Sequence, residues 1–205
     1  MMAAEGGIQA NRRRKGDSFM ELAEIPTRTY TEEDYYSLPE NVRAELIDGQ
    51  FYDMASPARI HQKISGELYA SIHSHIRSHG GSCEIYSAPF AVKLSADERT
   101  IVEPDISVIC DPEKLTEKGC TGAPDWIVEI VSPSSRRIDY HIKLFKYHTA
   151  GVKEYWIVDP EKKRILVYNF EHEDTVEYTF SDSVASGIFD GLSIDFASIP
   201  GLSDL

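Results

Sequence analysis

The stretch DWIVEIVSPSS, residues 125–135, has the composition of a buried β-strand with a charge at its centre. Its aromatic and β-branched residues favour a strand, and the polar run Ser132–Ser135 ends it. Side-chain alternation puts Glu129 on one face with Ile127 and Val131. The opposite face then carries Trp126, Val128 and Ile130. Because an unpaired buried carboxylate is costly, Glu129 needs a partner and is the first candidate functional residue.

Length and composition indicate one ordinary globular domain. The chain has 205 residues, of which 41% are hydrophobic, enough to bury a substantial core. We expect residues 1–24 to form a flexible N-terminal tail. Residues 25–205 are then expected to form a single domain that ends in an acidic segment, residues 171–205.

Targeting and cysteine patterns favour a cytoplasmic protein. The first twenty residues lack the apolar core of a signal peptide. No apolar run approaches the roughly 20 residues that span a bilayer, so no membrane contact is expected. The three cysteines, Cys83, Cys110 and Cys120, show no CxxC spacing, which favours reduced thiols over disulfides or a zinc site.

The net charge of −13 argues against a simple nucleic-acid-binding surface. The basic cluster Arg12–Lys15 lies in the expected tail, where solvation explains it. Residues 171–205 contain eight acidic residues and no Lys or Arg. Binding to DNA would therefore need a local arrangement of charge or bound metal ions.

Hydrophobic patterns along the chain predict the secondary structure. A capping-box-like Thr31 starts a helix at residues 31–38, and Asp48-Gly49 turns a hairpin at residues 44–55. A longer helix with Ser56 as its N-cap is expected to run to the glycines at residues 80–81, because isoleucine and leucine recur every four residues. The remaining expected elements are strands at 83–89, 90–94, 104–110 and 125–131, irregular chain at 111–124, a helix at 134–148, a hairpin at 154–170, and a short strand pair with a surface-lying end in the acidic segment.

This order of elements predicts an α/β (α+β) domain with a mixed central sheet flanked by helices. The chain contains neither GxGxxG nor GxxxxGK[ST], so no nucleotide cofactor is expected.

A second acid stands on a neighbouring predicted strand. Within the stretch PDISVIC, residues 104–110, Asp105 opens a predicted strand and shares a face with Ser107 and Ile109. If this strand pairs with residues 125–131, Asp105 and Glu129 converge on one face of the sheet. When two carboxylates lie so near each other, either the pKa of one of them is raised or a cation is held between them. Oxygen ligands suit Mg²⁺ or Mn²⁺.

The pattern resembles the PD-(D/E)XK nucleases, with Pro104-Asp105 as the "PD" and Glu129 as the acid of the following strand. More narrowly, the chain is similar to the Uma-type restriction-endonuclease-like family, which is abundant in cyanobacteria. The resemblance covers roughly residues 29–170. It is carried by AELIDGQFYDMASPARIHQKI, IVEPDISVIC, DWIVEIVSPSSRRIDYHIKLFKYHTAGVKEYWIVDP and RILVYNF.

The resemblance implies a restriction-endonuclease-like fold and a metal-dependent endonuclease that hydrolyses DNA phosphodiester bonds. It implies Asp105 and Glu129 as ligands of Mg²⁺ (or Mn²⁺), DNA as substrate, and a homodimer, because two cuts in a duplex call for two sites.

One position departs from the superfamily pattern. The expected lysine two residues after the acid is Val131 in this chain. We expect Lys143, on the following helix, to replace it. Lys146 would serve if the helix were rotated, and Lys93 is a more remote candidate. Alternatively, Asp139 and Lys143 form an ordinary surface ion pair.

The resemblance implies further site residues. Glu45 matches an acid that the superfamily often places beside the metal, and His61 matches a common histidine on the long helix. Asp139 and Tyr147 share the helical stripe of Lys143 and are accessory candidates. The structural alternatives are a solvated strand-edge carboxylate for Glu45 and a half-buried or surface imidazole for His61.

Two other classes of function remain open. A catalytically weak or inactive member would retain the fold as a nucleic-acid- or protein-binding module. Alternatively, the acidic segment, residues 171–205, mediates assembly, and Asp105 and Glu129 are a buried structural pair.

Overall fold

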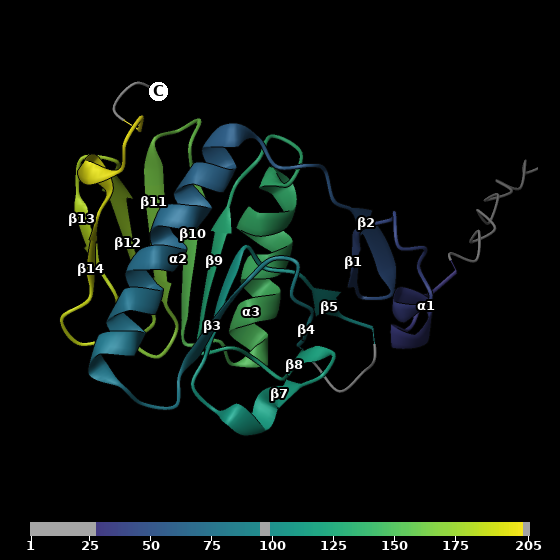
Figure 1. The fold of residues 1–205 in the computed structure, drawn as a ribbon. Coiled ribbons are helices and arrows are strands. Elements are labelled where there is room, and N and C mark those ends of the chain that lie inside the picture. The colour runs from purple at the N-terminus through teal and green to yellow at the C-terminus, as the bar shows by residue number, and fades with distance from the viewer. Residues whose placement is uncertain (1–27, 95–98, 203–205) are drawn as a thin grey trace, which may run out of the picture.

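The computed structural model describes residues 28–94 and 99–202. Within them, most strands belong to two six-stranded sheets, and helices pack against the sheet with the longer strands, called the main sheet below (Figure 1). This is the α+β arrangement with a mixed sheet that the sequence predicts. The expected tail at residues 1–24 lies outside the described residues.

The main sheet has the strand order β12-β11-β10-β9-β6-β3. Strands β9 and β10 are parallel, and the other neighbours are antiparallel. The bounds are β3 Glu84–Ser87, β6 Ile106–Ile109, β9 Trp126–Ile130, β10 Glu154–Asp159, β11 Arg164–Asn169 and β12 Asp174–Thr179. The two central strands β9 and β10 are buried along their whole length, which explains their nearly continuous apolar sequences.

The smaller sheet lies at the other side of the molecule and has the order β2-β1-β5-β4-β8-β7. Its bounds are β1 Ala44–Ile47, β2 Gln50–Asp53, β4 Val92–Lys93, β5 Ile101–Val102, β7 Leu115–Thr116 and β8 Gly119–Thr121. The predicted hairpin is confirmed as β1 and β2. Asp48 and Gly49 turn it with φ of 50° and 75°, the left-handed region that this tight turn requires. Strands β5, β7 and β8 were not predicted. The stretch 111–124, where irregular chain with room for one helical turn was expected, contains one 3₁₀ turn, η1 (Pro112–Lys114).

Two helices precede the strands of the main sheet. The short α1 (Glu32–Tyr36) begins after the predicted cap, where Asp34 Oδ2 accepts a hydrogen bond from Thr31 N at 3.0 Å. The long α2 (Arg59–His79) crosses in front of the main sheet (Figure 1) and ends at Gly80, as predicted. Its expected start was wrong: Ala58 is the N-cap and Ser56 makes no cap bond, so the helix begins after the Ser-Pro pair. No helix in the described ranges is long and apolar enough to span a bilayer.

The two faces of the main sheet have different coverings. The face of Trp126, Val128 and Ile130 packs against the apolar stripe of α2. The opposite face, which carries Ile127 and Val131, packs against α3 (Leu144–Ala150). The alternation predicted for β9 is therefore confirmed.

The second long helix differs from the regular helix expected at residues 134–148. Its first part, η2 (Ile138–Lys143), is π-helical and continues directly into α3, which Gly151 ends with φ of 93°. Single π-helical turns are rare and occur often at functional sites. Both Asp139 and Lys143 are buried in η2.

The acidic segment is more deeply integrated than predicted. The expected strand pair is present as β13 (Ser183–Ala185) and β14 (Ser193–Asp195), and the turn η3 (Phe196–Ser198) follows. However, β12 extends the main sheet, and Val184 and Phe196 are fully buried against the α2 side. The expectation of a surface-lying end was wrong, because these apolar residues complete the core.

The expectation of three reduced cysteines was also wrong. Cys83 and Cys110 form a disulfide, while Cys120 is free and buried. The register explains the pairing: Glu84 lies opposite Ile109 in the antiparallel β3–β6 pair, so the next residues outward face each other.

Candidate active site

The pairing of β6 with β9 brings Asp105 and Glu129 together. Ile106 lies opposite Val128 in this antiparallel pair, so Asp105 is level with Glu129. Asp105 Oδ2 accepts a hydrogen bond from the Ile130 N–H at 2.7 Å, and Glu129 Oε2 accepts a weaker one from the Asp105 N–H at 3.4 Å. Each strand therefore holds the carboxylate of the other, and the predicted convergence is confirmed.

The charge at the centre of β9 has its partners on the covering helix. Glu129 Oε1 accepts hydrogen bonds from Lys143 Nζ at 2.8 Å and from the Tyr147 hydroxyl at 2.6 Å. The two other candidate lysines point elsewhere, since Lys146 pairs with Asp48 and Lys93 pairs with Glu32. Lys143 is thus the candidate lysine that reaches the acids, as predicted. Its catalytic role stays a prediction.

Two further acids surround the same ammonium group. Lys143 Nζ lies 2.8 Å from Glu45 Oε1 and 3.6 Å from Asp139 Oδ1. The three side chains are only 3–5% exposed, so the alternatives of a surface ion pair and of a solvated Glu45 are wrong. Glu45 is fixed by the Glu103 N–H, which donates to its Oε1 at 2.8 Å.

His61 reaches the cluster from the first turn of α2. Its Nε2 lies 3.0 Å from Asp105 Oδ2, and the side chain is 14% exposed. Its Nδ1 is buried and makes no hydrogen bond within the described residues. All seven candidate residues therefore meet in one place, and they come from β1, α2, β9, η2, α3 and the residue before β6.

Burial governs the electrostatics of this cluster. It raises the pKa of Glu129 well above its usual range, against the attraction of Lys143. It also raises the pKa of Asp139 to about 6. For Lys143, burial acts to lower the pKa, but the attraction of Glu129, Glu45 and Asp139 outweighs it and the pKa rises. The lysine therefore stays an ammonium, and the cluster holds more carboxyl groups than cations.

The arrangement suits a hard divalent cation with water ligands. In residues 28–94 and 99–202, no three His, Cys, Asp or Glu side chains are arranged to bind a metal ion by themselves. Mg²⁺ needs only one or two carboxylates, because water and substrate oxygens complete its shell. Asp105 Oδ1 accepts no hydrogen bond from the described part of the chain, and Glu129 Oε2 accepts only the 3.4 Å contact. These two oxygens fit the requirement.

The acids line a cleft, which we call the acidic cleft, with a cavity volume of about 450 Å³. Its walls come from residues 52–58, 61 and 62, the loop at residues 132–135, and the seven residues 43, 45, 88, 103, 105, 138 and 139, together with Glu129, Ile130 and Lys143. Asp105 and Glu129 therefore line the same cleft.

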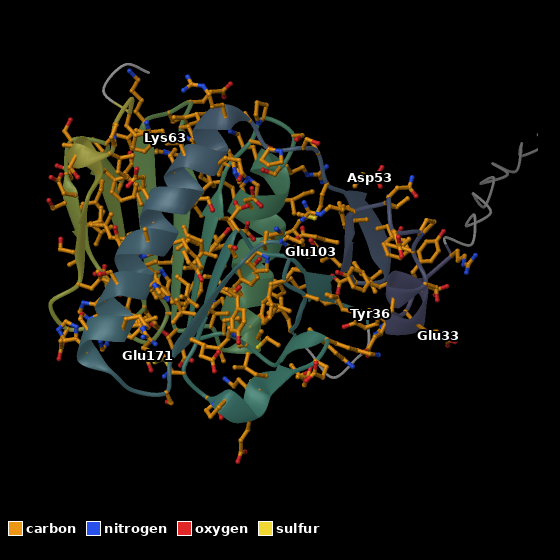
Figure 2. The ribbon with its side chains drawn as sticks, viewed as in Figure 1. Glu33, Tyr36, Asp53, Lys63, Glu103 and Glu171 are labelled. Carbon is orange, nitrogen blue, oxygen red and sulfur yellow. A yellow bond between two sulfur atoms is a disulfide. The ribbon has the colours of Figure 1, made fainter. Side chains whose placement is uncertain are left out.

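Sequence reasoning missed a supporting group at one end of the acidic cleft. Glu103 lies between β1 and the main body of the molecule (Figure 2). Its carboxylate accepts hydrogen bonds from the Tyr35 hydroxyl at 2.8 Å and from Arg43 Nη2 at 2.6 Å. Glu103 stands two residues before Asp105, and that alternation is the only signal in the sequence that places both near the same site.

Comparison with known proteins identifies the family. The family model described as "Uma2: Putative restriction endonuclease" matches residues 32–197, most of the chain. The chain belongs to the Uma2 family. This assignment confirms the resemblance that the sequence suggested.

Relatives of this Uma2 protein include cyanobacterial proteins. An uncharacterised protein of Synechocystis is 29% identical over 140 residues, which cover 67% of this chain and 72% of the relative. A crystal structure titled as a putative nuclease of the DUF820 group, from Anabaena variabilis, superposes with a TM-score of 0.70 at 20% identity. The match covers 84% of this chain and 98% of that one. The family and the fold together support a nuclease.

Proposed function

We propose that this protein is a metal-dependent endonuclease that hydrolyses DNA phosphodiester bonds and uses Mg²⁺ or Mn²⁺. The observation that carries the proposal is the placement of Asp105 opposite Glu129, with Lys143 Nζ 2.8 Å from Glu129 Oε1. Two acids can hold a divalent metal ion, and an ammonium group beside them can stabilise negative charge on a phosphate; both effects promote phosphodiester hydrolysis.

The residues of the cluster have different roles in the proposed reaction. Asp105 and Glu129 would hold the ion, which when bound supplies a polarised phosphate and a water of lowered pKa. Lys143, kept charged by its acidic neighbours, stabilises negative charge that develops on the phosphate. Glu45, Asp139 and Tyr147 fix the position of Lys143 and of Glu129 Oε1.

His61 has a positioning role in this scheme. It contacts Asp105 Oδ2 together with the Ile130 N–H, so the other oxygen of Asp105 is directed to the acidic cleft. A cation at this place also explains how a chain of net charge −13 engages a polyanion, since it offsets repulsion where the phosphate must bind.

The test is a pair of isosteric substitutions, Asp105→Asn and Glu129→Gln. Each is expected to abolish Mg²⁺-dependent cleavage of plasmid DNA while circular dichroism stays that of the wild type. Glu67→Gln makes the same change of atoms at a partly exposed carboxylate on α2, outside the acidic cleft, and as the matched control it should cleave normally. Full activity in either site variant would refute the assignment.

A second candidate function rests on the closure of the ion-paired cluster. Lys143 already lies between Glu45 and Glu129, and such a cluster also suits an inactive member that binds nucleic acid or protein. Thermal unfolding with added Mn²⁺ separates the two. If the site is that of a nuclease, added Mn²⁺ should raise the melting temperature of the wild type but not that of Glu129→Gln. If the protein is a binding module, added Mn²⁺ should change the melting temperature of neither protein.

We further propose that the protein acts in the cytoplasm as a homodimer, because cleavage of both strands of a duplex requires two sites. Light scattering coupled to gel filtration tests the dimer: a monomer mass at working concentration would remove it.

A further inference from the structure

The acidic cleft contains one basic side chain that the proposed mechanism does not use. Among the cleft residues that the structure describes, the basic ones are Arg43, His61 and Lys143. Lys143 is held by Glu45 and Glu129, and His61 contacts Asp105. Arg43 is different, because its side chain is 42% exposed while that of Lys143 is 5% exposed.

The backbone places Arg43 on the side of β1 that carries Glu45. Arg43 directly precedes β1, and its carbonyl accepts a hydrogen bond from the Met54 N–H at 3.0 Å, so the β1–β2 ladder continues to this residue. Residues two apart on a strand point to the same side. Arg43 and Glu45 therefore both line the acidic cleft, with Arg43 nearer its mouth.

One end of the Arg43 guanidinium is anchored. Its Nη2 donates to Glu103 Oε2 at 2.6 Å and also lies 3.8 Å from Met54 Sδ. The side chain of Glu103 is only 10% exposed, and its other oxygen accepts from the Tyr35 hydroxyl. A buried carboxylate with two donors is a fixed support, so Arg43 has little freedom to turn away from the acidic cleft.

The remaining donors of Arg43 are available for a ligand. A guanidinium has five N–H donors, and in the described residues only Nη2 makes hydrogen bonds. The planar guanidinium matches the geometry of a phosphate group, which lysine binds only as a point charge.

We infer that Arg43 binds a backbone phosphate of the nucleic acid next to the one that is cleaved, and that Glu103 and Tyr35 position it. The inference rests on the proposed nuclease function and adds a substrate-binding residue to it. The same chain segment joins the two sites: Glu103 holds Arg43 through its carboxylate and Glu45 through its N–H.

The inference predicts a specific salt dependence. Each phosphate contact by a cation releases counterions, so the logarithm of the binding constant falls with the logarithm of the salt concentration by about 0.9 per contact. Loss of one contact should reduce that slope by about 0.9 and weaken binding equally for all sequences. It should leave the chemical step at saturating DNA unchanged, because Arg43 does not contact the scissile phosphate.

The experiment compares Arg43→Gln, Arg43→Lys and a control, Arg77→Gln. Arg77 is exposed on the last turn of α2, so its substitution changes the net charge by the same amount outside the acidic cleft. The kcat and KM for cleavage of a plasmid in Mg²⁺ are measured over roughly 50 to 200 mM KCl, the range in which such slopes are large. Binding of a short fluorescent duplex is followed by anisotropy over the same range.

Arg43→Gln is expected to raise KM about tenfold, the loss of one charged hydrogen-bonding contact, with kcat within about twofold of the wild type. Its salt slope should fall by about 0.9. Arg43→Lys should restore the slope but not the full affinity, and Arg77→Gln should match the wild type.

Two results would overturn the inference, and they are distinguishable. If the wild type cleaves DNA and Arg43→Gln has the same slope as Arg77→Gln, the phosphate contact is wrong and the nuclease proposal stands. If the wild type neither binds nor cleaves the duplex with Mg²⁺ or Mn²⁺, both proposals fail together.

Discussion

The two faces of β9 use the same strand in opposite ways. On the α2 face, Trp126, Val128 and Ile130 enter an apolar core that also receives the C-terminal segment. On the α3 face, Glu129 meets Lys143 and Tyr147 through short polar contacts. The α2 face packs through apolar area, which tolerates small shifts. The α3 face has an apolar cluster of its own, but the acids there also depend on a few directed hydrogen bonds, which do not tolerate such shifts.

The difference between the two faces separates residues that mainly stabilise the fold from the residues of the candidate site. Burial of apolar surface favours folding wherever it occurs, but a buried charge is tolerated only beside its partner. A main sheet with one apolar face can therefore carry a costly polar cluster on the other face without losing its fold. Variants of each face should respond accordingly.

The largest effect is expected for Lys143→Met, which removes the cation but keeps the volume of the side chain. Glu45, Glu129 and Asp139 would then be buried without their ammonium, and unfolding free energy should fall by about 3 to 5 kcal/mol. Chemical denaturation measures this. Lys146→Met, three residues along the chain, is the matched control. It removes the partly exposed ion pair with Asp48, and the free energy of unfolding should change by less than about 1 kcal/mol. Equal stability of the two variants would show that the α3 face does not depend on Lys143.

A slightly smaller effect is expected on the apolar face from Leu68→Ala. Leu68 is fully buried on α2, and such a truncation typically costs about 2 to 5 kcal/mol by lost burial and cavity formation. Ser74→Ala, on the exposed side of the same helix, should change the stability by less than about 0.5 kcal/mol. If DNA cleavage is measured below the unfolding transition, Leu68→Ala should retain it. A loss of cleavage in the folded variant would mean that the two faces are coupled.

The smallest effect concerns Glu154, the buried carboxylate on the apolar face. It has hydrogen bonds from Trp156 Nε1 and the Gly187 N–H, both at 2.6 Å, but no cationic partner in the described part of the chain, and burial raises its pKa to about 7. The folded state therefore binds a proton that the unfolded state, with a pKa of about 4.5, has lost. The contribution of this group to stability is full below about pH 4.5 and disappears as the pH rises through about 7, a change of at most about 3 kcal/mol.

Chemical denaturation at several pH values tests whether stability falls as the pH rises. The series runs from about pH 5 to about pH 8, the approximate range of a raised carboxyl pKa. The wild type should lose stability with rising pH more steeply than Glu154→Gln, which cannot titrate. Only the difference in slope matters, because glutamine cannot accept both hydrogen bonds. Parallel curves would mean that Glu154 is ionised throughout and that the apolar face tolerates a charge without a cation.

Much of the site could be predicted from periodicity. Alternation placed Glu129 opposite the tryptophan face, and the spacing of four residues from Asp139 to Lys143 and Tyr147 put all three on one side of a helix. These patterns predict side-chain positions because strands and helices have fixed repeats. A shift of one residue in strand register would turn every side chain of that strand to the other face of the sheet. The π-helical turn itself gave no signal, since its residues also suit an α-helix.

What could not be predicted depends on contacts between distant segments. Strands β5 and β7 have two residues each and show no repeat to recognise. The Cys83–Cys110 disulfide and the support of Arg43 by Glu103 follow from strand register and from the meeting of the two sheets. The burial of Phe196 follows from the path of the chain over α2, which the acidic composition of residues 171–205 concealed.

The hydrogen bond from the Ile130 N–H to Asp105 Oδ2 depends on the register of β6 against β9, which matters while the chain folds. If β6 shifts by one residue along β9, Asp105 turns to the α2 side and the pair of acids no longer exists. A newly made or partly unfolded chain therefore has no nuclease site. The proposed activity requires the correct pairing of β6 with β9, so a molecule that lacks this pairing would not cut the DNA of the cell that makes it.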